Sequence, residues 1–343
     1  MTGQSRRDAL HNTGMVSLAA VASAMLGSTQ TRAVTIPAVP GPPAPFGLGP
    51  RSGLAWHSGS GLSSVNAMAA YRNRLCDTVT LWCKFDSWDT ILSFNGGIKA
   101  VKSKPERISI GIAPLPKTLH AVTTPGVWAL AASGAFDYYY AEWARRLQAT
   151  GRTDVIVRVG WEINRKFPWY AGADPANYII THRRIVDYLR LYNPRVSIEW
   201  CNVKKGNQAG SVLDLYPGND WVDIIGVDYY DVGPPLNDET IWNAQYMRLY
   251  KGGPWGIGAW LQFAKDNGKL FACAEWGIRV GATPANIDNA FYIRKMFEFF
   301  AANASYIAYE NYFNQKTEHQ LTPATVNPLA SAEYLRLWGQ PLI

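Results

Sequence analysis

The sequence of 343 residues predicts an α/β protein built as a single (β/α)8 TIM barrel. Short runs rich in β-branched and aromatic residues alternate with longer amphipathic stretches over residues 51–343. The runs are hydrophobic almost throughout, which is typical of parallel strands whose outer face is covered by helices. Eight such β-then-α units in roughly 290 residues fit a barrel of this kind, which typically needs about 250 residues.

Eight runs are expected to form the strands. In chain order they are Ser52–Trp56, Thr78–Phe85, Ile108–Pro114, Asp154–Asn164, Val196–Val203, Val222–Tyr230, Lys269–Gly277 and Tyr306–Phe313. Helices are expected at Phe136–Gln148, Ala176–Leu191, Ala259–Asn267 and Asn286–Ala302. A doubly wound open sheet is the alternative, but it normally carries a glycine-rich nucleotide turn after an early strand, and the sequence has none.

The composition excludes several classes of protein. Hydrophobic residues make up 48% of the chain, and charged residues 17%, against about 25% in an average soluble domain. Disordered, coiled-coil and collagen-like chains do not have this mixture. The formal net charge of +7 is not concentrated in a Lys/Arg cluster, so nucleic acid is not an expected partner.

The N-terminus resembles a twin-arginine-type export signal. Arg6 and Arg7 precede a weakly hydrophobic segment at residues 15–26, with cleavage expected after Ala33 and cleavage after Ala24 as the alternative. The segment is shorter than the roughly 20 residues that span a bilayer, so we expect no stable membrane insertion once the signal is removed. The expected partner is the twin-arginine export machinery, and the expected location is the periplasm or the medium; a frayed cytosolic N-terminus is the alternative.

The chain is expected to contain one folded domain. The predicted organisation is an export signal at residues 1–33, a Pro/Gly-rich lead-in at 34–50 and the barrel domain at 51–343. Its four cysteines lie in apolar surroundings and are expected to be buried free thiols, with a Cys76–Cys83 disulfide as the alternative in an oxidising compartment. The five histidines have no paired spacing for a metal, and neither a serine-hydrolase elbow nor a phosphate-binding loop is present, so no cofactor is expected.

Two glutamates follow apolar runs at the C-terminal ends of the strands, here called the barrel mouth. Glu162 closes the fourth run and Glu275 the seventh, each beside a tryptophan. Burying such groups costs desolvation energy, and TIM barrels place their chemistry at this end of the strands. Two carboxyl groups across a barrel mouth suit glycoside hydrolysis, because one donates a proton and the other attacks the anomeric carbon or activates water. Pairing of each glutamate with an arginine such as Arg158 is the structural alternative.

The fourth run resembles the acid/base motif of glycoside hydrolase family 26, a family rich in endo-β-mannanases. The chain retains Arg158, Glu162, Asn164 and Phe167-Pro168-Trp169 of that motif, and it has Trp161 where the family usually has histidine. Glu275-Trp276-Gly277 resembles the nucleophile motif of the same family. Gly226-Val227-Asp228-Tyr229-Tyr230 matches its strand-six segment, whose tyrosine hydrogen-bonds the nucleophile.

The resemblance implies a retaining mechanism with Glu162 as acid/base and Glu275 as nucleophile. The pKa of Glu162 is expected to be raised by desolvation, and a tyrosine is expected to assist Glu275. Side chains alternate along a strand, so only one of Tyr229 and Tyr230 faces inward, and the sequence does not choose between them. Retention of configuration requires the two carboxyl groups to lie about 5–5.5 Å apart.

Aromatic side chains at the strand ends suit sugars, because flat rings stack on the apolar faces of sugar units. The candidate substrate-binding residues are Trp161, Asn164, Trp169, Tyr229, Tyr230, Trp276, Arg158, His57 and Trp82. The expected function is an exported, endo-acting β-glycosidase on β-mannan. The alternatives are the same mechanism on a bacterial exopolysaccharide, β-glucan or β-xylan, and a non-catalytic carbohydrate-binding barrel.

Overall fold

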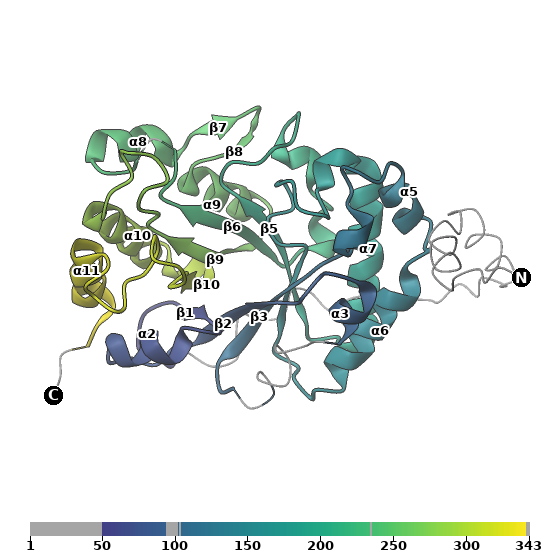
Figure 1. The fold of residues 1–343 in the computed structure, drawn as a ribbon, viewed down its shortest axis with the longest axis horizontal. Coiled ribbons are helices and arrows are strands. Elements are labelled where there is room, and N and C mark those ends of the chain that lie inside the picture. Colours follow the sequence, from purple (N-terminus) through teal and green to yellow (C-terminus); the bar gives the residue numbers. More distant parts are fainter. Residues whose placement is uncertain (1–49, 94–101, 103, 234, 341–343) are drawn as a thin grey trace, which may run out of the picture. The chain divides into compact units, whose positions relative to one another are not determined.

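The computed structural model describes residues 50–93, 102, 104–233 and 235–340, so the predicted export signal and residues 34–49 lie outside the described part. Eight parallel strands close into a barrel, each paired with its sequence neighbours and the last with the first (Figure 1). The prediction of a (β/α)8 barrel is therefore confirmed. Its strands are β1 Ser58–Gly61, β2 Thr78–Trp82, β3 Arg107–Ile112, β4 Ile156–Val159, β5 Ser197–Val203, β6 Ile224–Tyr230, β9 Leu270–Gly277 and β10 Ile307–Tyr312.

The first strand was predicted in the wrong place, at Ser52–Trp56 instead of Ser58–Gly61. The true strand reads Ser-Gly-Ser-Gly and lacks the β-branched and aromatic residues on which the prediction relied. Small residues are required here, because a Cβ at Gly59 would lie 1.9 Å from the Thr78 carbonyl oxygen of the neighbouring strand. Ser52 instead lies in a turn, where its backbone N–H and its hydroxyl both donate to the Asp77 carboxylate.

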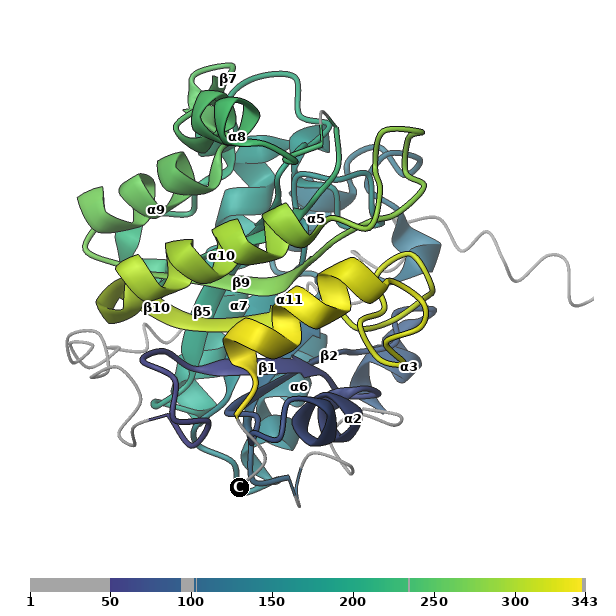
Figure 2. The same cartoon turned by 90° about the vertical axis from the view of Figure 1, so that its left-hand side faces the viewer.

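Helices cover the outer face of the barrel. They are α2 Val65–Tyr71, α3 Trp88–Leu92, α5 Val127–Ala132, α6 Asp137–Gln148, α7 Pro175–Tyr192, α8 Glu239–Tyr246, α9 Ile257–Asp266, α10 Ala290–Ala302 and α11 Pro328–Trp338. Figure 2 shows α10 and α11 side by side across the outer face of β9 and β10. The four predicted helices are confirmed as α6, α7, α9 and α10, although α10 begins only after Asn289, whose side chain accepts a hydrogen bond from the Tyr292 N–H.

The long insertion between β6 and α9 carries structure that the sequence did not predict. Besides α8 it holds a small antiparallel pair, β7 Leu249–Tyr250 and β8 Gly253–Pro254. No helix in the described part of the chain is both long enough and apolar enough to cross a membrane.

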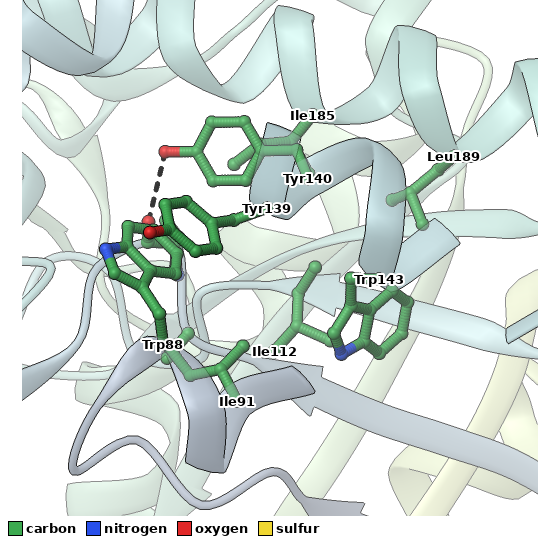
Figure 3. Close-up of a pocket in the computed structure, with 10 residues that line it drawn as sticks. Trp88, Ile91, Ile112, Tyr139, Tyr140, Trp143, Ile185 and Leu189 are labelled. Carbon is green, nitrogen blue, oxygen red and sulfur yellow. Dashed lines mark hydrogen bonds between the residues drawn. The ribbon is translucent and has the colours of Figure 1, made fainter. Parts of the chain in front are cut away.

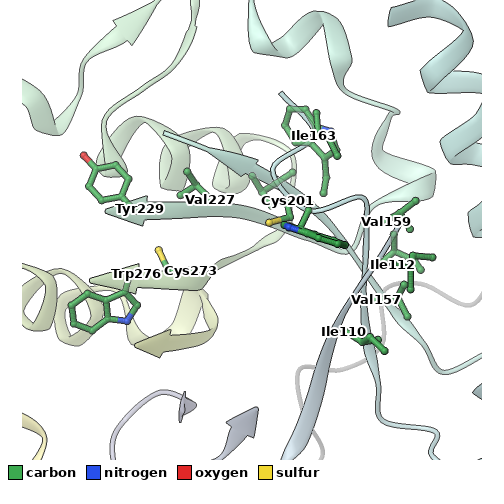
Figure 4. Packing of buried hydrophobic residues seen from close by; sticks show 14 of the residues in the cluster. Ile110, Ile112, Val157, Val159, Ile163, Cys201, Val227, Tyr229, Cys273 and Trp276 are labelled. Carbon is green, nitrogen blue, oxygen red and sulfur yellow. The ribbon is translucent and has the colours of Figure 1, made fainter. Parts of the chain in front are cut away.

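The core has two parts, separated by the barrel wall. The larger part lies between the strands and the helices, and Figure 4 shows a portion of it that includes Ile110, Val157 and Val227. The smaller part fills the barrel interior with Ile156, Ile224, Ala272, Ala274, Ala308 and Tyr309. All four cysteines are buried free thiols, as predicted, and no Cys76–Cys83 bridge forms.

One buried carboxylate, Glu310 of β10, points outward and holds three tryptophans together. The indole N–H of Trp338 donates to its Oε1 at 3.0 Å and that of Trp56 to the same oxygen at 3.4 Å. The indole N–H of Trp276 donates to Oε2 at 2.5 Å. The cluster ties α11 and the segment before β1 to the last two barrel strands, at the point where the barrel closes.

We predict that Glu310→Gln lowers the free energy of unfolding by about 2 kcal/mol. The amide has one acceptor oxygen instead of two, so a buried indole donor on the other side loses its partner. Urea unfolding followed by tryptophan fluorescence measures the effect. Glu333→Gln is the matched control, because Glu333 pairs with the exposed Arg336 and such surface pairs contribute only about 0–1 kcal/mol. Equal losses in the two variants would contradict the role given to the tryptophan cluster.

Candidate active site

Glu275 reaches the barrel mouth through an irregularity in β9. The register of β9 shifts against both neighbours. Against β6, Gly226 pairs with Ala272 but Tyr229 with Trp276, and two shifts occur against β10. An extra residue in one strand is a β-bulge, and bulges re-aim side chains beside active sites. Glu275 consequently faces the barrel mouth while Trp276 faces outward.

Three side chains donate hydrogen bonds to the Glu275 carboxylate. The indole N–H of Trp82, at the end of β2, donates to Oε1 at 2.9 Å, and Nη1 of Arg158 in β4 donates to the same oxygen at 3.1 Å. The hydroxyl of Tyr230, at the end of β6, donates to Oε2 at 3.0 Å. Three donors from three strands fix the orientation of the carboxylate and stabilise its negative charge.

The structure decides between the two strand-six tyrosines. Tyr230 faces inward onto Glu275, whereas Tyr229 faces outward, where the Lys204 ammonium lies 4.7 Å from the centre of its ring. The hydroxyl of Tyr292 in α10 donates to the Tyr229 backbone carbonyl. Tyr229, which Figure 4 shows within the outer core, is therefore a packing residue and not a substrate-binding one.

Glu162 lies in a sharp turn directly after β4. Gly160 has φ +69°, and a Cβ there would meet the side chains of Ile163 and Trp169 at 3.0 Å, so glycine is required. Glu162 itself has φ +47°, a conformation uncommon outside glycine, asparagine and aspartate and one that clusters at functional sites. The turn leaves the Glu162 side chain buried, at 6% exposure, with one oxygen 2.9 Å from Nη1 of Arg165.

Burial, and after it the negative charge of Glu275, raise the pKa of Glu162 to about 7. The Arg165 and Arg158 guanidiniums act in the opposite direction and lower it. A carboxyl group with a pKa near 7 can both give up and take back a proton at neutral pH.

Trp161 and Trp169 belong to an aromatic cluster beside Glu162, together with Phe85 and Phe167. The Trp161 and Trp169 rings lie 4.3 Å apart, and Trp169 stacks on Phe167 at 5.1 Å. Trp169 is completely buried, so it supports the turn and is not available to stack on a sugar. Trp161 packs over Gly111 of β3, where the Trp82 ring approaches as well.

Three further predicted substrate-binding residues are not free to bind a sugar: the Asn164 amide lies at the mouth but is bonded to backbone, and Trp276 and His57 lie away from the mouth. Both ends of the Asn164 amide bond to the backbone of Val203, so the amide links the ends of β4 and β5. Trp276 is buried against α10 and α11, because neighbouring residues of a strand face opposite sides. His57 precedes β1 and so lies at the N-terminal end of the barrel, where burial lowers the pKa of its ring.

Two buried carboxyl groups of the barrel interior were not predicted as site residues. Glu199 of β5 accepts a 2.5 Å hydrogen bond from Tyr309, and burial raises its pKa to about 7. Burial and the charge of Glu275 raise the pKa of Asp228 in β6 well above its usual range. Within the described residues, Glu199 Oε1 and Asp228 Oδ1 have no hydrogen-bond partner. The sequence signal that could have found them is a carboxyl group within a predominantly apolar strand, as in the fifth and sixth predicted runs.

Arg158 is the guanidinium that acts on all these carboxyl groups. It is completely buried, donates to Glu275, and lowers the pKa values of Glu162, Glu199 and Asp228. The sequence analysis offered pairing with Arg158 as the structural alternative for a glutamate. The pairing exists for Glu275, in a setting with more carboxyl groups than one arginine can neutralise, so it does not remove the case for chemistry.

His319, in the loop after β10, was also missed. Its ring lies 5.0 Å from that of Tyr230 and 5.2 Å from that of Phe313, and its Nδ1 is 2.6 Å from the Ile278 carbonyl oxygen. It therefore packs behind the tyrosine that holds Glu275. Burial lowers the pKa of His319, which favours a neutral ring.

Two hollows of the structure are lined by residues other than the two glutamates. One, shown in Figure 3, is an apolar gap between β3, α3, α6 and α7, where the Tyr140 hydroxyl donates to the Pro114 carbonyl. The other, of about 490 Å³, is polar and is lined by the loops after β9 and β10. Neither hollow is lined by Glu162 or Glu275.

Comparison with known proteins identifies the domain. Residues 134–270 match the family model described as glycosyl hydrolase family 26. Over this stretch the chain matches the family 26 glycosyl hydrolases. The matched stretch runs from just before α6 to the first residue of β9, so it contains Glu162 and ends before Glu275. The family resemblance predicted from the sequence motifs is confirmed.

Relatives of the family 26 domain include mannanases. Over 156 residues the chain is 31% identical to the mannan endo-1,4-beta-mannosidase of Bifidobacterium adolescentis, a match that covers 42% of this chain and only 15% of that protein. Among solved structures, the fold is similar to that of GH26C from Muricauda sp. MAR_2010_75, with a TM-score of 0.59 at 16% identity over 84% of this chain and 87% of the other. A modular endo-beta-1,4-mannanase from Cellulomonas fimi gives a TM-score of 0.60 at 16% identity over 83% and 71%. At these identities the structural likeness shows the fold.

Proposed function

We propose that the family 26 domain is an exported, retaining, endo-acting β-glycoside hydrolase that cleaves β-mannan. The observation that carries the proposal is the contrast between its two mouth carboxyl groups. Glu275 is held by three hydrogen-bond donors, whereas the pKa of Glu162 is raised to about 7. A desolvated carboxyl group with a raised pKa suits the acid of a glycosidase, and a carboxylate held by three hydrogen-bond donors suits its nucleophile.

The proposed reaction has two steps. In the first, protonated Glu162 gives its proton to the glycosidic oxygen as a Glu275 oxygen bonds to the anomeric carbon, and the leaving sugar departs. In the second, the Glu162 carboxylate takes a proton from water as the water oxygen attacks the anomeric carbon and releases Glu275. Tyr230, Trp82 and Arg158 keep the attacking carboxylate in one orientation throughout, which lowers the entropic part of the barrier.

β-Mannan is the favoured substrate because the curated relative is named a mannan endo-1,4-beta-mannosidase. Trp161 stands where the family usually has histidine, so a β-glucan, a β-xylan or a bacterial exopolysaccharide remain alternative substrates. The test is to incubate the protein with a panel of these polymers, with Glu275→Gln as the control. Oligosaccharide release from mannan by the wild type alone supports the proposal, and release from another polymer replaces the substrate.

Two further outcomes of the same test are informative. Release of single sugars from chain ends, without a fall in polymer viscosity, would contradict endo action. Binding of a polymer without any release would favour the non-catalytic carbohydrate-binding barrel. Proton NMR of the first product gives its anomeric configuration, and an α-anomer from a β-linked substrate would contradict the retaining mechanism.

Export is part of the proposal and rests on the paired Arg6 and Arg7 before a weakly hydrophobic segment. Residues 1–33 fused to a reporter enzyme are expected to carry it out of the bacterial cytoplasm. Replacing both arginines by lysine is the matched control, since it preserves charge and hydrophobicity. Export that survives this change, or that continues in cells without the twin-arginine machinery, would contradict the proposed route.

A further inference from the structure

Arg165 is not part of the family motif, yet it makes a direct ion pair with Glu162. It lies three residues after Glu162 in the turn that follows β4, with Nη1 2.9 Å from Glu162 Oε2. Its guanidinium carbon lies 5.4 Å from the centre of the Phe167 ring. The Glu162 side chain is 6% exposed and that of Arg165 is 51% exposed, so the guanidinium lies between the carboxyl group and solvent.

The groups that face Glu162 differ in charge and in origin. Glu275 of β9 raises the pKa of Glu162. Asp228 and Tyr230 lie in β6, and the charge of Glu162 raises the pKa of each of them. Burial and the neighbouring negative charge disfavour ionisation of Glu162.

Two cations oppose this effect. Arg158, inside the barrel, is already paired with Glu275. Arg165 makes its direct ion pair with Glu162 itself, and its contribution to the pKa of Glu162 is larger than that of Arg158.

We propose that Arg165 is a positioning residue for the reaction proposed above: its ion pair with Glu162, braced on Phe167, holds the acid/base carboxyl in place and keeps it able to ionise at neutral pH. The role of Arg165 in the reaction rests on the proposed function, whereas its effect on the ionisation of Glu162 does not. A retaining glycosidase needs its acid/base protonated in the first step and ionised in the second. Arg165 stabilises the ionised form that receives the proton from water.

The consequence of removing the charge has a definite sign. An opposite charge within about 4–6 Å favours the charged form of a carboxyl group, so its loss raises the pKa of that group. Because Arg165 is half exposed and screened by water, we expect a rise of about one pH unit for Glu162 in Arg165→Gln. Glu162 would then stay protonated at neutral pH, and the second step would slow.

The primary experiment needs no substrate. Protein labelled with ¹³C at the glutamate carboxyl carbons is titrated by NMR, and the Glu162 signal is assigned by its absence in Glu162→Gln. Arg165→Gln and Arg165→Met are each expected to raise the Glu162 midpoint by about one pH unit, the methionine keeping an alkyl stem over Phe167. Arg165→Lys keeps a positive charge and is expected to restore most of the wild-type midpoint.

Arg145→Gln is the matched control. Arg145 pairs with Glu142 three residues away, in α6, and its side chain is 52% exposed, close to the value for Arg165. This variant should leave the Glu162 titration unchanged. An unchanged Glu162 midpoint in the folded Arg165→Gln or Arg165→Met protein would overturn the proposal, as would failure of Arg165→Lys to restore the midpoint.

Activity provides the second readout. On the polymer that the panel identifies, the basic limb of kcat/KM for Arg165→Gln should move upward by the same interval as the NMR midpoint. A shifted midpoint in a protein that hydrolyses no polymer would leave the electrostatic role of Arg165 standing and count against the proposed function alone. If the NMR midpoint of Glu162 shifts in an active enzyme while the basic limb of kcat/KM stays in place, Arg165 does not act on the reaction through Glu162, and the catalytic part of the proposal is overturned.

Discussion

Replacing Glu275 by alanine is expected to lower turnover of the polysaccharide on the order of 10⁴-fold or more. The carboxylate supplies the electron pair that forms the glycosyl-enzyme, and its three donors, Trp82, Arg158 and Tyr230, have no nucleophilic replacement to offer. The measurement is the release of reducing ends under saturating polymer. Turnover within about tenfold of the wild type would contradict the assignment of Glu275 as nucleophile.

Chemical rescue separates the two glutamates. Azide can enter the space that the Glu275 carboxylate leaves and attack the anomeric carbon of an activated aryl β-glycoside from the same face. The product from Glu275→Ala is then an α-glycosyl azide, whereas Glu162→Ala, which still forms the glycosyl-enzyme, gives the β-anomer. The opposite pattern would exchange the two roles. Glu106→Gln is the matched control, since Glu106 is also a buried glutamate but precedes β3 at the far end of the barrel.

The fold should survive the loss of Glu275 for an electrostatic reason. Removing one partner of a buried ion pair typically costs about 3–5 kcal/mol, because the other charge is left uncompensated. Arg158 has other carboxyl groups within electrostatic reach, and the pKa of Glu199 lies at about 7. Ionisation of Glu199 can therefore replace the lost charge. Thermal unfolding of Glu275→Gln above and below pH 7 tests this, with the larger destabilisation expected on the acid side.

The barrel was predictable because seven of its strands lie in predominantly apolar runs, which hydrophobic patterning detects. The first strand escaped detection because close contact with β2 demands glycine and serine, which carry no strand signal. His57 was misplaced for the same reason. Because β1 spans residues 58–61 and not 52–56, His57 precedes the strand and lies at the N-terminal end of the barrel, away from the mouth.

The catalytic pair was predictable from charged residues at the ends of apolar strands, but its surroundings were not. Trp276 follows Glu275 directly, and strand alternation alone argues that both cannot face the mouth. Which of the two faces inward depends on the bulge in β9, which appears only in the pairing register. Glu199 and Asp228 are also charged residues in apolar runs, as Glu162 is. Glu199 belongs to no recognised motif, and the strand-six motif that contains Asp228 gave a role only to its tyrosine.

Replacing Glu162 by glutamine is expected to slow polysaccharide cleavage by about 10²–10⁴-fold, the usual contribution of a general acid. The loss should depend on the leaving group. Glutamine cannot protonate the glycosidic oxygen of a polymer, whereas an aryl group of low pKa leaves without that proton. Formation of the glycosyl-enzyme from an activated aryl glycoside should therefore be nearly normal, and equal loss on both substrates would contradict the acid role.

The pH profile provides an independent check on Glu162. Its pKa of about 7 means that the protonated acid is lost, and kcat/KM falls, as the pH rises through that value. Glu162→Gln should abolish this basic limb on the aryl substrate. Because the pKa of Glu199 is also raised to about 7, Glu199→Gln is the necessary comparison, and it should leave the limb in place. If the basic limb disappears in Glu199→Gln instead, the titrating group is Glu199, which contradicts the assignment of the limb to Glu162.

The same raised pKa makes Glu162 a cost to stability. A carboxyl group whose pKa is higher in the folded state binds its proton more tightly there, so the protein loses stability as the pH rises from the unfolded value, about 4.3, through about 7. Glu162→Gln removes the titrating group and should unfold at a higher temperature than the wild type at pH 8, with little difference at pH 4.5. A catalytic residue that destabilises its own fold at working pH is the expected consequence of desolvating an acid. A variant less stable than the wild type at pH 8 would show that the Arg165 ion pair outweighs that cost.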